Sequence, residues 1–368
     1  MKKVLFLGAS GRVGETASRF LLEHYAEAEL TLVTRSSVPD MQRFGDSVSR
    51  VRHINADIFA AGILSELVKG QDLVVSCVGP SCRVGTAVID ACISEKVPLL
   101  DVSGYDPALK YLDSLGRTGD IHSPVVVNSG LLPGLSGSYP LYMISKYRKD
   151  SEVINVEVFY AGRDTWSFNS AMDIVVSLGG FGDNKGFCRI EDGRVKKIGF
   201  LKSLVKVKFP EMPENLSGLS MYSEEMMRLI NAENIKNATV SGANIGKKAG
   251  LSLMWSMLLK RYRSEKGILK GAASLVKAAK KDALTADPFF GIYCRLTMSD
   301  GKTATGYLTA GDTYALTGMV MGINALYMLS HGVKPGGYSM HEAIPCNYII
   351  HYLLNNQAVR IRESVNSD

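Results

Sequence analysis

The sequence predicts an α/β protein with a doubly wound parallel sheet and a second domain that has its own strands. Over residues 1–135, apolar strands and helical segments alternate with short links, which is the pattern of a parallel sheet covered by helices. A half-buried strand at 152–160 and a hairpin at 291–308 add separate sheet elements. A chain of 368 residues is long enough for two such domains.

The first strand, Val4 to Leu7, runs into a glycine turn. The glycines Gly8, Gly11 and Gly14 let the backbone approach a phosphate closely, although their spacing differs from the G-x-G-x-x-G fingerprint. Residues 15–22 carry apolar side chains at helical spacing, so the turn lies at a helix N-terminus, where amide groups attract a pyrophosphate. The segment therefore predicts a dinucleotide site.

The second strand, Leu30 to Val33, is followed by Thr34, Arg35 and Ser36. An NAD site usually has Asp or Glu here for the ribose 2′-hydroxyl, whereas an NADP site has Arg for the 2′-phosphate. No carboxylate lies between Thr31 and Val38. The position thus predicts NADPH (NADP⁺ when oxidised) as the cofactor, and the alternative for Arg35 is an ordinary surface arginine.

The next strands are predicted at 54–58, 72–80, 98–103 and 125–128, with a helix at 85–94. Asp57 either lies beside the adenine or caps a helix at 60–68. The carboxyl ends of parallel strands meet at one edge, so the candidate cofactor ligands come from these ends. They are Gly8, Ser10, Gly11, Arg12, Val13, Gly14, Thr34, Arg35, Ser36, Ala56, Asp57, Ile58, Cys77, Val78, Gly79, Pro80, Ser103 and Gly104.

Composition excludes several other classes. The 46% hydrophobic and 21% charged content is that of an ordinary globular chain. The six cysteines form no Cys-x-x-Cys pair and the six histidines no metal-spaced pair, so neither a disulfide framework nor a metal site is predicted. The apolar start is too short for a signal peptide, and no run of about 18 apolar residues predicts a membrane span. We expect a cytoplasmic protein.

The order of several motifs resembles the saccharopine dehydrogenase (reductase)-like family over nearly the whole chain. They are Gly8-x-x-Gly11-Arg12-Val13-Gly14, Ala56-Asp57, Val75-x-Cys77-Val78-Gly79-Pro80, Asp101-Val102-Ser103-Gly104 and Gly130-Leu131-Leu132-Pro133-Gly134-Leu135-Ser136. The resemblance implies an NADP-binding Rossmann domain from 1–135 plus 312–368, with the C-terminal helices folding back. It also implies an inserted α+β substrate and dimerisation domain at 136–311 on a mixed sheet. Family members use a nicotinamide cofactor to make or break a C–N bond by hydride transfer to an imine.

Candidate catalytic groups follow the fifth predicted strand. Tyr105 is the first candidate for proton donor or substrate orienter, with Asp106 beside it, Asp101 behind and Ser129 nearby. The alternative for Tyr105 is a rim tyrosine that packs at the domain joint. Asp106 alternatively caps a helix that begins at Pro107.

Candidate substrate residues come from several segments. The resemblance implies that Asn169 and Ser170 face the nicotinamide, although the family's usual Gly-Thr pair is replaced here by Asn-Ser. Ser129 and Gly130 follow the sixth predicted strand, and Arg83, like Arg163, suits a substrate carboxylate.

The stretch Leu251 to Leu284 is helical in composition and rich in Lys and Arg. It is either a solvated helical face with snorkelling Lys stems or a docking surface for an acidic carrier protein or an anionic membrane. Aromatic residues are not interleaved with the charges, which argues against nucleic acid. We also expect a homodimer.

Together these patterns predict an NADPH-dependent oxidoreductase that reduces a C=N (imine) bond. The specific hypothesis is a carrier-tethered thiazolinyl imine of siderophore biosynthesis. The alternatives are a saccharopine- or opine-type dehydrogenase acting on a free amino-acid imine, an enoyl (C=C) reductase of lipid-like substrates, and a non-catalytic NADPH-sensing protein.

Overall fold

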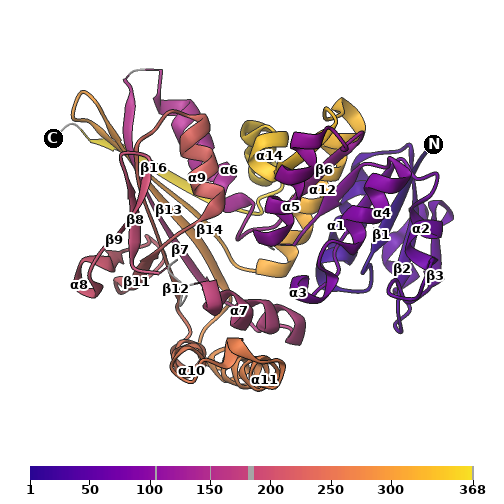
Figure 1. The fold of residues 1–368 in the computed structure, drawn as a ribbon, viewed down its shortest axis with the longest axis horizontal. Helices are drawn as coiled ribbons and strands as arrows, with labels where there is room; N and C mark the ends of the chain where they lie inside the picture. Colours follow the sequence, from indigo (N-terminus) through magenta and orange to yellow (C-terminus); the bar gives the residue numbers. More distant parts are fainter. Residues whose placement is uncertain (104–105, 150, 181–185, 367–368) are drawn as a thin grey trace. The chain divides into compact units, whose positions relative to one another are not determined.

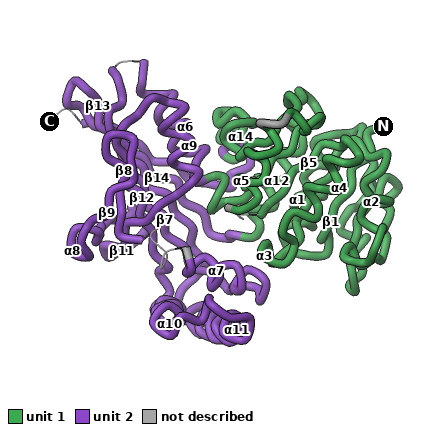
Figure 2. The backbone as a smooth tube through the Cα atoms, viewed as in Figure 1, with its two compact units in different colours: residues 1–135, 314–353 green, residues 136–313, 354–368 purple. Residues whose placement is uncertain are grey.

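The computed structural model describes residues 1–103, 106–149, 151–180 and 186–366 (Figure 1). The chain divides into two compact units, and each unit is made of two separate segments (Figure 2). Unit 1 comprises residues 1–135 and 314–353. Unit 2 comprises residues 136–313 and 354–368.

The described residues of unit 1 form a seven-stranded sheet in the order β15-β6-β5-β4-β1-β2-β3. Every neighbouring pair is parallel. The strands are β1 (Lys2–Leu7), β2 (Ala28–Thr34), β3 (Val51–Asn55), β4 (Leu73–Ser76), β5 (Leu99–Asp101), β6 (Pro124–Val127) and β15 (Gly336–Ser339). The strand order reverses between β1 and β4, so this point is the topological switch of a doubly wound sheet. The predicted α/β fold is confirmed.

Helices cover the sheet of unit 1 and bury its apolar strands. They are α1 (Arg12–His24), η1 (Met41–Arg50), α2 (Ile63–Val68), α3 (Ser81–Val84), α4 (Ala87–Glu95), α5 (Asp106–Thr118), α12 (Thr313–His331), α13 (Met340–Ala343) and α14 (Cys346–Asn355). Val88 and Ile89 of α4 pack with Leu5 and Val74 of the strands. The helices α12 and α14 fold back onto α1. The rings of Phe20 on α1 and Tyr352 on α14 lie 6.2 Å apart, and a Cβ at Gly322 of α12 would lie 2.7 Å from the Phe20 ring.

Several elements of unit 1 differ from the sequence prediction. The strands predicted at 72–80 and 98–103 end earlier, at Ser76 and Asp101. The pattern predicts a strand at 54–58, but β3 ends at Asn55, because pairing with β2 places Ile54 opposite Val33. Helix α2 begins at Ile63, so the predicted helix at 60–68 is shorter at its start. The strand β15 was not predicted, because Gly336 to Ser339 has no apolar run.

The described residues of unit 2 form a mixed nine-stranded sheet in which β10-β11-β12-β7-β13-β14-β16 are neighbours and β8 and β9 join at β12. The strands are β7 (Val153–Arg163), β8 (Cys188–Glu191), β9 (Arg194–Lys197), β10 (Leu204–Val207), β11 (Leu216–Met221), β12 (Asn237–Asn244), β13 (Phe289–Met298), β14 (Thr303–Ala310) and β16 (Arg360–Asn366). β7 is parallel to β12 and antiparallel to β13. The predicted strand and hairpin are therefore present.

Seven helical segments accompany this sheet in the described part of the chain. They are α6 (Leu135–Tyr147), α7 (Phe168–Gly180), α8 (Phe200–Ser203), α9 (Glu224–Ala232), α10 (Lys247–Leu258), η3 (Arg261–Arg263) and α11 (Glu265–Asp282). The last three form a helical hairpin, which we call the α10–α11 hairpin. Its position agrees with the helical composition of residues 251–284.

The C-terminal segment differs from its expected place. The resemblance implies that all of 312–368 belongs to the Rossmann domain, but residues 354–368 belong to unit 2. The physical reason is the pairing of β16 with β14, which places Glu363 opposite Gly306. Glu363 also accepts hydrogen bonds from Lys146 at 2.6 Å and Tyr147 at 2.7 Å.

Candidate functional site

The candidate site is the edge of the unit 1 sheet where the carboxyl ends of its parallel strands meet. Because β4, β1, β2 and β3 are neighbours in the sheet, the segments that follow them lie at the same edge. Ligands of open α/β sheets bind at this edge, beside the switch point. The cofactor residues predicted from the sequence follow β1, β2, β3, β4 and β5, so the fold brings their segments to one edge.

The glycine turn after β1 is built from close backbone contacts. Gly8 has φ +75°, and a Cβ there would lie 2.8 Å from the Cys77 carbonyl oxygen. A Cβ at Gly14 would lie 2.6 Å from the carbonyl oxygen of Gly8. The Gly11 amide donates to that same oxygen at 3.2 Å, and α1 begins at Arg12 with no side-chain cap. The turn therefore presents a helix N-terminus whose first amides suit a pyrophosphate.

The segment after β2 is held against the glycine turn by hydroxyl groups. Ser37 donates to the Ser10 hydroxyl at 2.6 Å. The buried Thr34 hydroxyl donates to the Ser37 carbonyl and contacts His53 Nε2 at 2.7 Å. These bonds order the backbone around Arg35 and Ser36, which are both exposed.

Arg35 differs from the other arginines near the turn. Arg43 pairs with Glu15 and with Asp40, and the Arg12 guanidinium lies 4.8 Å from the Tyr314 ring. Among the residues that the structure describes, none forms an ion pair or hydrogen bond with Arg35. An exposed guanidinium without an internal partner, at the end of the second strand, fits the 2′-phosphate of NADP.

The segment after β3 is a turn that lies partly against the core. The Ala56 amide donates to the Thr34 carbonyl at 2.9 Å, and Ala56 and Ile58 pack on the hydrophobic cluster of unit 1. The Asp57 carboxylate accepts from the Phe59 amide at 3.0 Å. Asp57 therefore caps a local turn, and the alternative role as cap of a helix at 60–68 is wrong.

The segment after β4 contributes main chain and a neutral thiol. The Cys77 amide donates to the Leu7 carbonyl at 2.9 Å, Val78 packs against the unit 1 core, and Pro80 precedes α3. Burial raises the pKa of the Cys77 thiol well above its ordinary value, and the charge of Asp101 adds to this. The thiol is therefore protonated at neutral pH, so the segment suits close backbone approach rather than nucleophilic chemistry.

A buried polar cluster lies at the ends of β5 and β6. Asp101 accepts hydrogen bonds from the Ser103 amide at 3.0 Å and the Ser103 hydroxyl at 3.1 Å. Burial raises the Asp101 pKa to about 6, although both bonds from Ser103 act to lower it. The carboxyl group therefore exchanges its proton near neutral pH, which suits proton transfer in a reaction.

Two further residues belong to this cluster. The backbone N–H of Asn128 donates to the Ser103 carbonyl at 3.0 Å, and the backbone N–H of Ser129 donates to the Asp101 carbonyl at 3.1 Å. Within the described residues, the buried side-chain oxygens of Asn128 and Ser129 have no hydrogen-bond partner. Such atoms are costly unless a ligand or water satisfies them, so a bound water or a polar ligand group is expected beside them.

Of the two predicted catalytic residues, Asp106 lies within the residues that the structure describes and Tyr105 does not. Tyr105 lies outside the described residues, as does the cofactor candidate Gly104. The helix α5 begins at Asp106, one residue before the start at Pro107 that the capping alternative gives. The catalytic roles of Tyr105 and Asp106 therefore stay predictions.

The predicted substrate residues are divided between the units. Arg83 on α3, Ser129 and Gly130 belong to unit 1, whereas Asn169 and Ser170 belong to the first turn of α7 in unit 2. The Ser170 amide donates to the Ser167 hydroxyl at 3.1 Å, so Ser170 is part of a helix cap. Arg163 donates from Nε to the Asp287 carbonyl at 2.8 Å.

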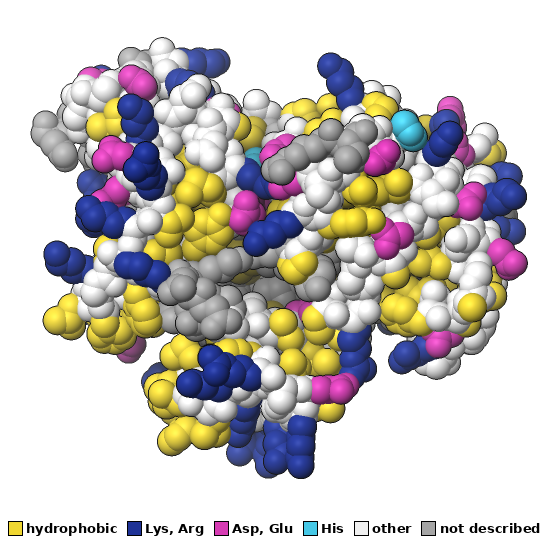
Figure 3. Space-filling view, viewed as in Figure 1, with side chains coloured by type: hydrophobic (Ala, Val, Ile, Leu, Met, Phe, Trp, Pro, Cys, Tyr) yellow, Lys and Arg dark blue, Asp and Glu magenta, His cyan; other side chains and the backbone are white. Residues whose placement is uncertain are grey.

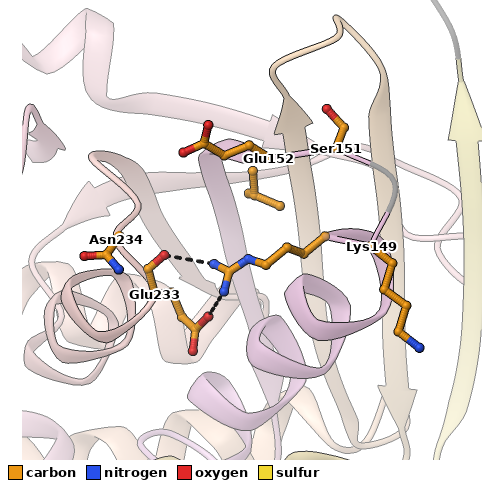
Figure 4. Close-up of a pocket in the computed structure, with 7 residues that line it drawn as sticks. Lys149, Ser151, Glu152, Glu233 and Asn234 are labelled. Carbon is orange, nitrogen blue, oxygen red and sulfur yellow. Dashed lines mark hydrogen bonds and ion pairs between the residues drawn. The ribbon is translucent and has the colours of Figure 1, made fainter.

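A surface cavity of about 460 Å³ lies in unit 2, lined by Arg148, Lys149, Ser151, Glu152, Val153, Glu233 and Asn234 (Figure 4). Arg148 pairs with the Glu233 carboxylate and also donates to the Glu233 carbonyl at 2.9 Å. Lys149 extends away from Glu233 in Figure 4. Part of the cavity wall is thus an ion pair between Arg148 and Glu233. The labelled polar side chains point in different directions, so they do not form a common binding point for a ligand.

His53 and Asn128 are candidate site residues that the sequence pattern did not indicate. His53 lies on β3, and the parallel pairing of β2 with β3 brings its ring to Thr34. Asn128 has φ +56° directly after the apolar run of β6. A polar residue of this type just after a buried strand is the one signal in the sequence that points to Asn128.

The structure was also searched for metal sites. Among the residues that it describes, no group of three or more His, Cys, Asp or Glu side chains could hold a metal ion.

Comparison with known proteins agrees with this geometry. Residues 4–119 match the saccharopine dehydrogenase NADP binding domain family. The mitochondrial α-aminoadipic semialdehyde synthase of Bos taurus is 32% identical over 165 residues, which are 44% of this chain and 17% of that protein. This chain therefore covers less than two thirds of that relative.

Two solved structures resemble the whole chain. Saccharopine dehydrogenase (L-Glu forming) from Saccharomyces cerevisiae has a TM-score of 0.65 at 15% identity, covering 100% of both chains. Homospermidine synthase from Legionella pneumophila, solved in complex with NAD, has a TM-score of 0.65 at 13% identity and covers 100% of this chain and 92% of its own. Residues 4–119 are thus similar to the saccharopine dehydrogenase NADP binding domain, and the chain as a whole has a fold like that of saccharopine dehydrogenase.

Proposed function

We propose that this chain is an NADPH-dependent oxidoreductase that acts on a carbon–nitrogen bond. The observation that carries the proposal is the pairing of two anion sites at one sheet edge: the uncapped N-terminus of α1 and the exposed guanidinium of Arg35. The first fits a pyrophosphate and the second fits the 2′-phosphate that distinguishes NADP from NAD. The family of the segment 4–119 supports nucleotide binding.

In the proposed reaction, the cofactor supplies the hydride, and the chain binds the nucleotide and supplies a proton. NADPH, when bound, supplies a hydride. The turn amides and Arg35 hold the nucleotide, and the buried Asp101 holds an exchangeable proton at the same edge. Reduction of an imine requires that proton at nitrogen, so we assign Asp101 to proton transfer, either directly or through Tyr105.

For the substrate, we favour the imine of a small amino acid over the carrier-tethered thiazolinyl imine. The names of the similar proteins, saccharopine dehydrogenase and aminoadipic semialdehyde synthase, support a free amino-acid substrate. In unit 1, Arg83 of α3 is a suitable partner for a substrate carboxylate.

The test is a calorimetric titration with NADPH and with NADH, on the parent chain and on Arg35→Ala. We expect the parent to bind NADPH about tenfold or more tightly than NADH, which corresponds to about 1.4 kcal/mol, and the variant to lose this preference. Arg19→Ala removes the same charge from an arginine that pairs with Glu23 on α1, so it is the matched control and should keep the preference.

A second measurement addresses the reaction. NADPH oxidation is followed with mixtures of 2-oxo acids or aldehydes and amino acids, with a synthetic thiazoline imine, and with enoyl esters. Turnover of the first mixtures supports the proposal. Binding of neither nucleotide, turnover of enoyl esters alone, or tight NADPH binding without turnover of any acceptor would overturn it.

A further inference from the structure

The helix α10 has an unusual distribution of side chains. Its exposed face carries Leu251, Met254, Trp255, Leu258 and the following Leu259, which we call the outer stripe, and these side chains are 44 to 60% exposed. Their spacing of three, four, seven and eight residues places them along one side of a helix. The stripe therefore forms a continuous apolar ridge toward solvent.

The opposite face of α10 packs with small residues. Ala249, Ser252 and Ser256 are buried, and the Ser252 hydroxyl donates to the Ser274 hydroxyl on α11 at 2.9 Å. A helix of a soluble protein normally turns its large apolar residues inward, but α10 turns most of them outward, and Leu253 packs against the buried cluster that includes Ala249 and Leu275. A contiguous exposed apolar patch of this kind marks an interaction surface.

Basic side chains are concentrated in the same hairpin as the outer stripe. Residues 247–284 contain ten Lys and Arg but only Glu265 and Asp282 as acids, so this segment carries +8 where the whole chain carries +6. Asp282 is buried and accepts from the Lys248 and Ala249 amides at 3.0 and 2.8 Å, so its charge is directed at the N-terminus of α10. Figure 3 shows apolar and basic side chains gathered together over α10 and α11.

We propose that the α10–α11 hairpin binds the surface of an anionic phospholipid bilayer, with the outer stripe inserted at the headgroup level and the Lys and Arg side chains on the lipid phosphates. A bilayer accepts a projecting apolar ridge, Trp prefers the interface, and long basic side chains reach the phosphates. The inference is independent of the proposed reaction.

Other occupants fit these features less well. A second copy of the chain would bring two segments of +8 together, and like charges at an interface repel. An acidic carrier protein complements the charge but would have to supply a groove for a convex ridge of Trp and Leu. In the chain as far as it is described, no helix is long and apolar enough to cross a membrane. The hairpin accordingly lies on the bilayer.

Trp255 provides the direct test. The chain has two tryptophans, and Trp166→Phe leaves Trp255 as the single indole. With vesicles of phosphatidylglycerol and phosphatidylcholine, we expect a blue shift of Trp255 emission and quenching by lipids brominated on the acyl chains. With vesicles of phosphatidylcholine alone, we expect neither. Flotation of the parent chain with both kinds of vesicle repeats the measurement without the Trp166 substitution.

Variants separate the apolar and the electrostatic contributions to vesicle binding. Leu258→Asp places a carboxylate in the outer stripe and should weaken vesicle binding at least tenfold. Joint Lys266→Gln, Lys277→Gln and Lys280→Gln should weaken it by about 100-fold, and added salt should act in the same direction. Leu201→Ser and Lys110→Gln remove an exposed apolar and an exposed basic side chain elsewhere, so they should leave binding unchanged.

Two results would overturn the proposal. The first is absence of flotation with anionic vesicles. In that case, sedimentation of a parent dimer that Leu258→Asp converts to monomer would identify a second copy as the occupant, and binding to an acidic carrier protein would identify that protein. The second is flotation that Leu258→Asp does not change.

Discussion

The sheet edge of unit 1 and the α10–α11 hairpin of unit 2 are both proposed binding surfaces, but they are built differently. The edge consists of main chain, glycines and buried polar groups such as Asp101, whereas the hairpin presents large exposed side chains such as Trp255 and Leu258. A Cβ added at Gly8 or Gly14 of the edge would lie too close to backbone atoms, which cannot move aside as a flexible side chain can. A surface made of exposed side chains can change without cost to the fold.

The largest effect is expected at the glycine turn. Gly8 and Gly62 have nearly the same φ, +75° and +77°, but a Cβ at Gly62 meets nothing within 4 Å. Gly62→Ala should lower the free energy of unfolding by about 1 kcal/mol from the backbone conformation alone. Gly8→Ala should lower it by about 3 kcal/mol, because the Cys77 carbonyl must also move, and NADPH affinity should fall about 100-fold.

Urea denaturation and calorimetric titration of both variants measure these effects. The two variants share the cost of the backbone conformation. The difference between their losses of unfolding free energy therefore measures the cost of the close approach of Gly8 to the Cys77 carbonyl. Equal losses of stability at Gly8 and Gly62 would contradict the view that the edge is closed by main chain.

Asp101 should make stability depend on pH in a defined direction. Its pKa in the folded chain is about 6, above the ordinary 3.8, so the folded state binds the proton more tightly than the unfolded chain. Its contribution to stability is therefore fully present below pH 3.8 and is lost as the pH rises through about 6. The loss is of the order of 3 kcal/mol.

Asp101→Asn lacks this titration. Its free energy of unfolding, relative to the parent chain, should rise between pH 4 and pH 7, as followed by urea denaturation at each pH. A constant difference for Asp101→Asn would mean that burial does not raise the pKa of the Asp101 carboxyl group.

A smaller effect is expected at the end of β2. Thr34→Val removes the hydroxyl that bonds the Ser37 carbonyl and His53, so stability should fall by about 1.5 kcal/mol and the preference for NADPH over NADH should decrease. Thr31→Val on the same strand loses only the bond from Arg52 and serves as the control. If both variants keep the full preference in nucleotide titrations, the hydroxyl bonds do not position Arg35.

The smallest effect on folding is expected in the outer stripe. Leu258→Ser should change the free energy of unfolding by less than about 0.5 kcal/mol, because the side chain is exposed. Leu275→Ala on α11 removes a fully buried side chain and should cost about 3 kcal/mol. Thermal and urea unfolding compare the two, and a large loss at Leu258 would show that another part of the chain covers the stripe.

The positions of β1 and β4 were predictable from the sequence because their apolar runs are continuous. Val4 to Leu7 and Leu73 to Ser76 are buried, so these strands can be recognised without knowledge of their neighbours, although the strand predicted at 72–80 ends at Ser76. The limits of β3 could not be predicted, because the register with β2 determines them. The strand Gly336 to Ser339 exists only through its pairing with β6.

The face of α10 that points to solvent could not be predicted from the sequence either. Its Leu, Met and Trp residues form an apolar helical pattern, which ordinarily indicates the face toward the core. Packing against α11 through Ala249 and Ser252 reverses this expectation. The basic composition of 251–284 was visible, whereas the outward stripe was not.

The sequence by itself determined the α/β fold, the glycine turn and the position of Arg35, because each depends on residues that are adjacent along the chain. Only the tertiary structure decided that β16 joins unit 2, that Asp101 is buried with a raised pKa and that α10 turns its apolar face outward. The physical reason is that register, desolvation and exposure are properties of neighbours in space, which the order of residues does not specify.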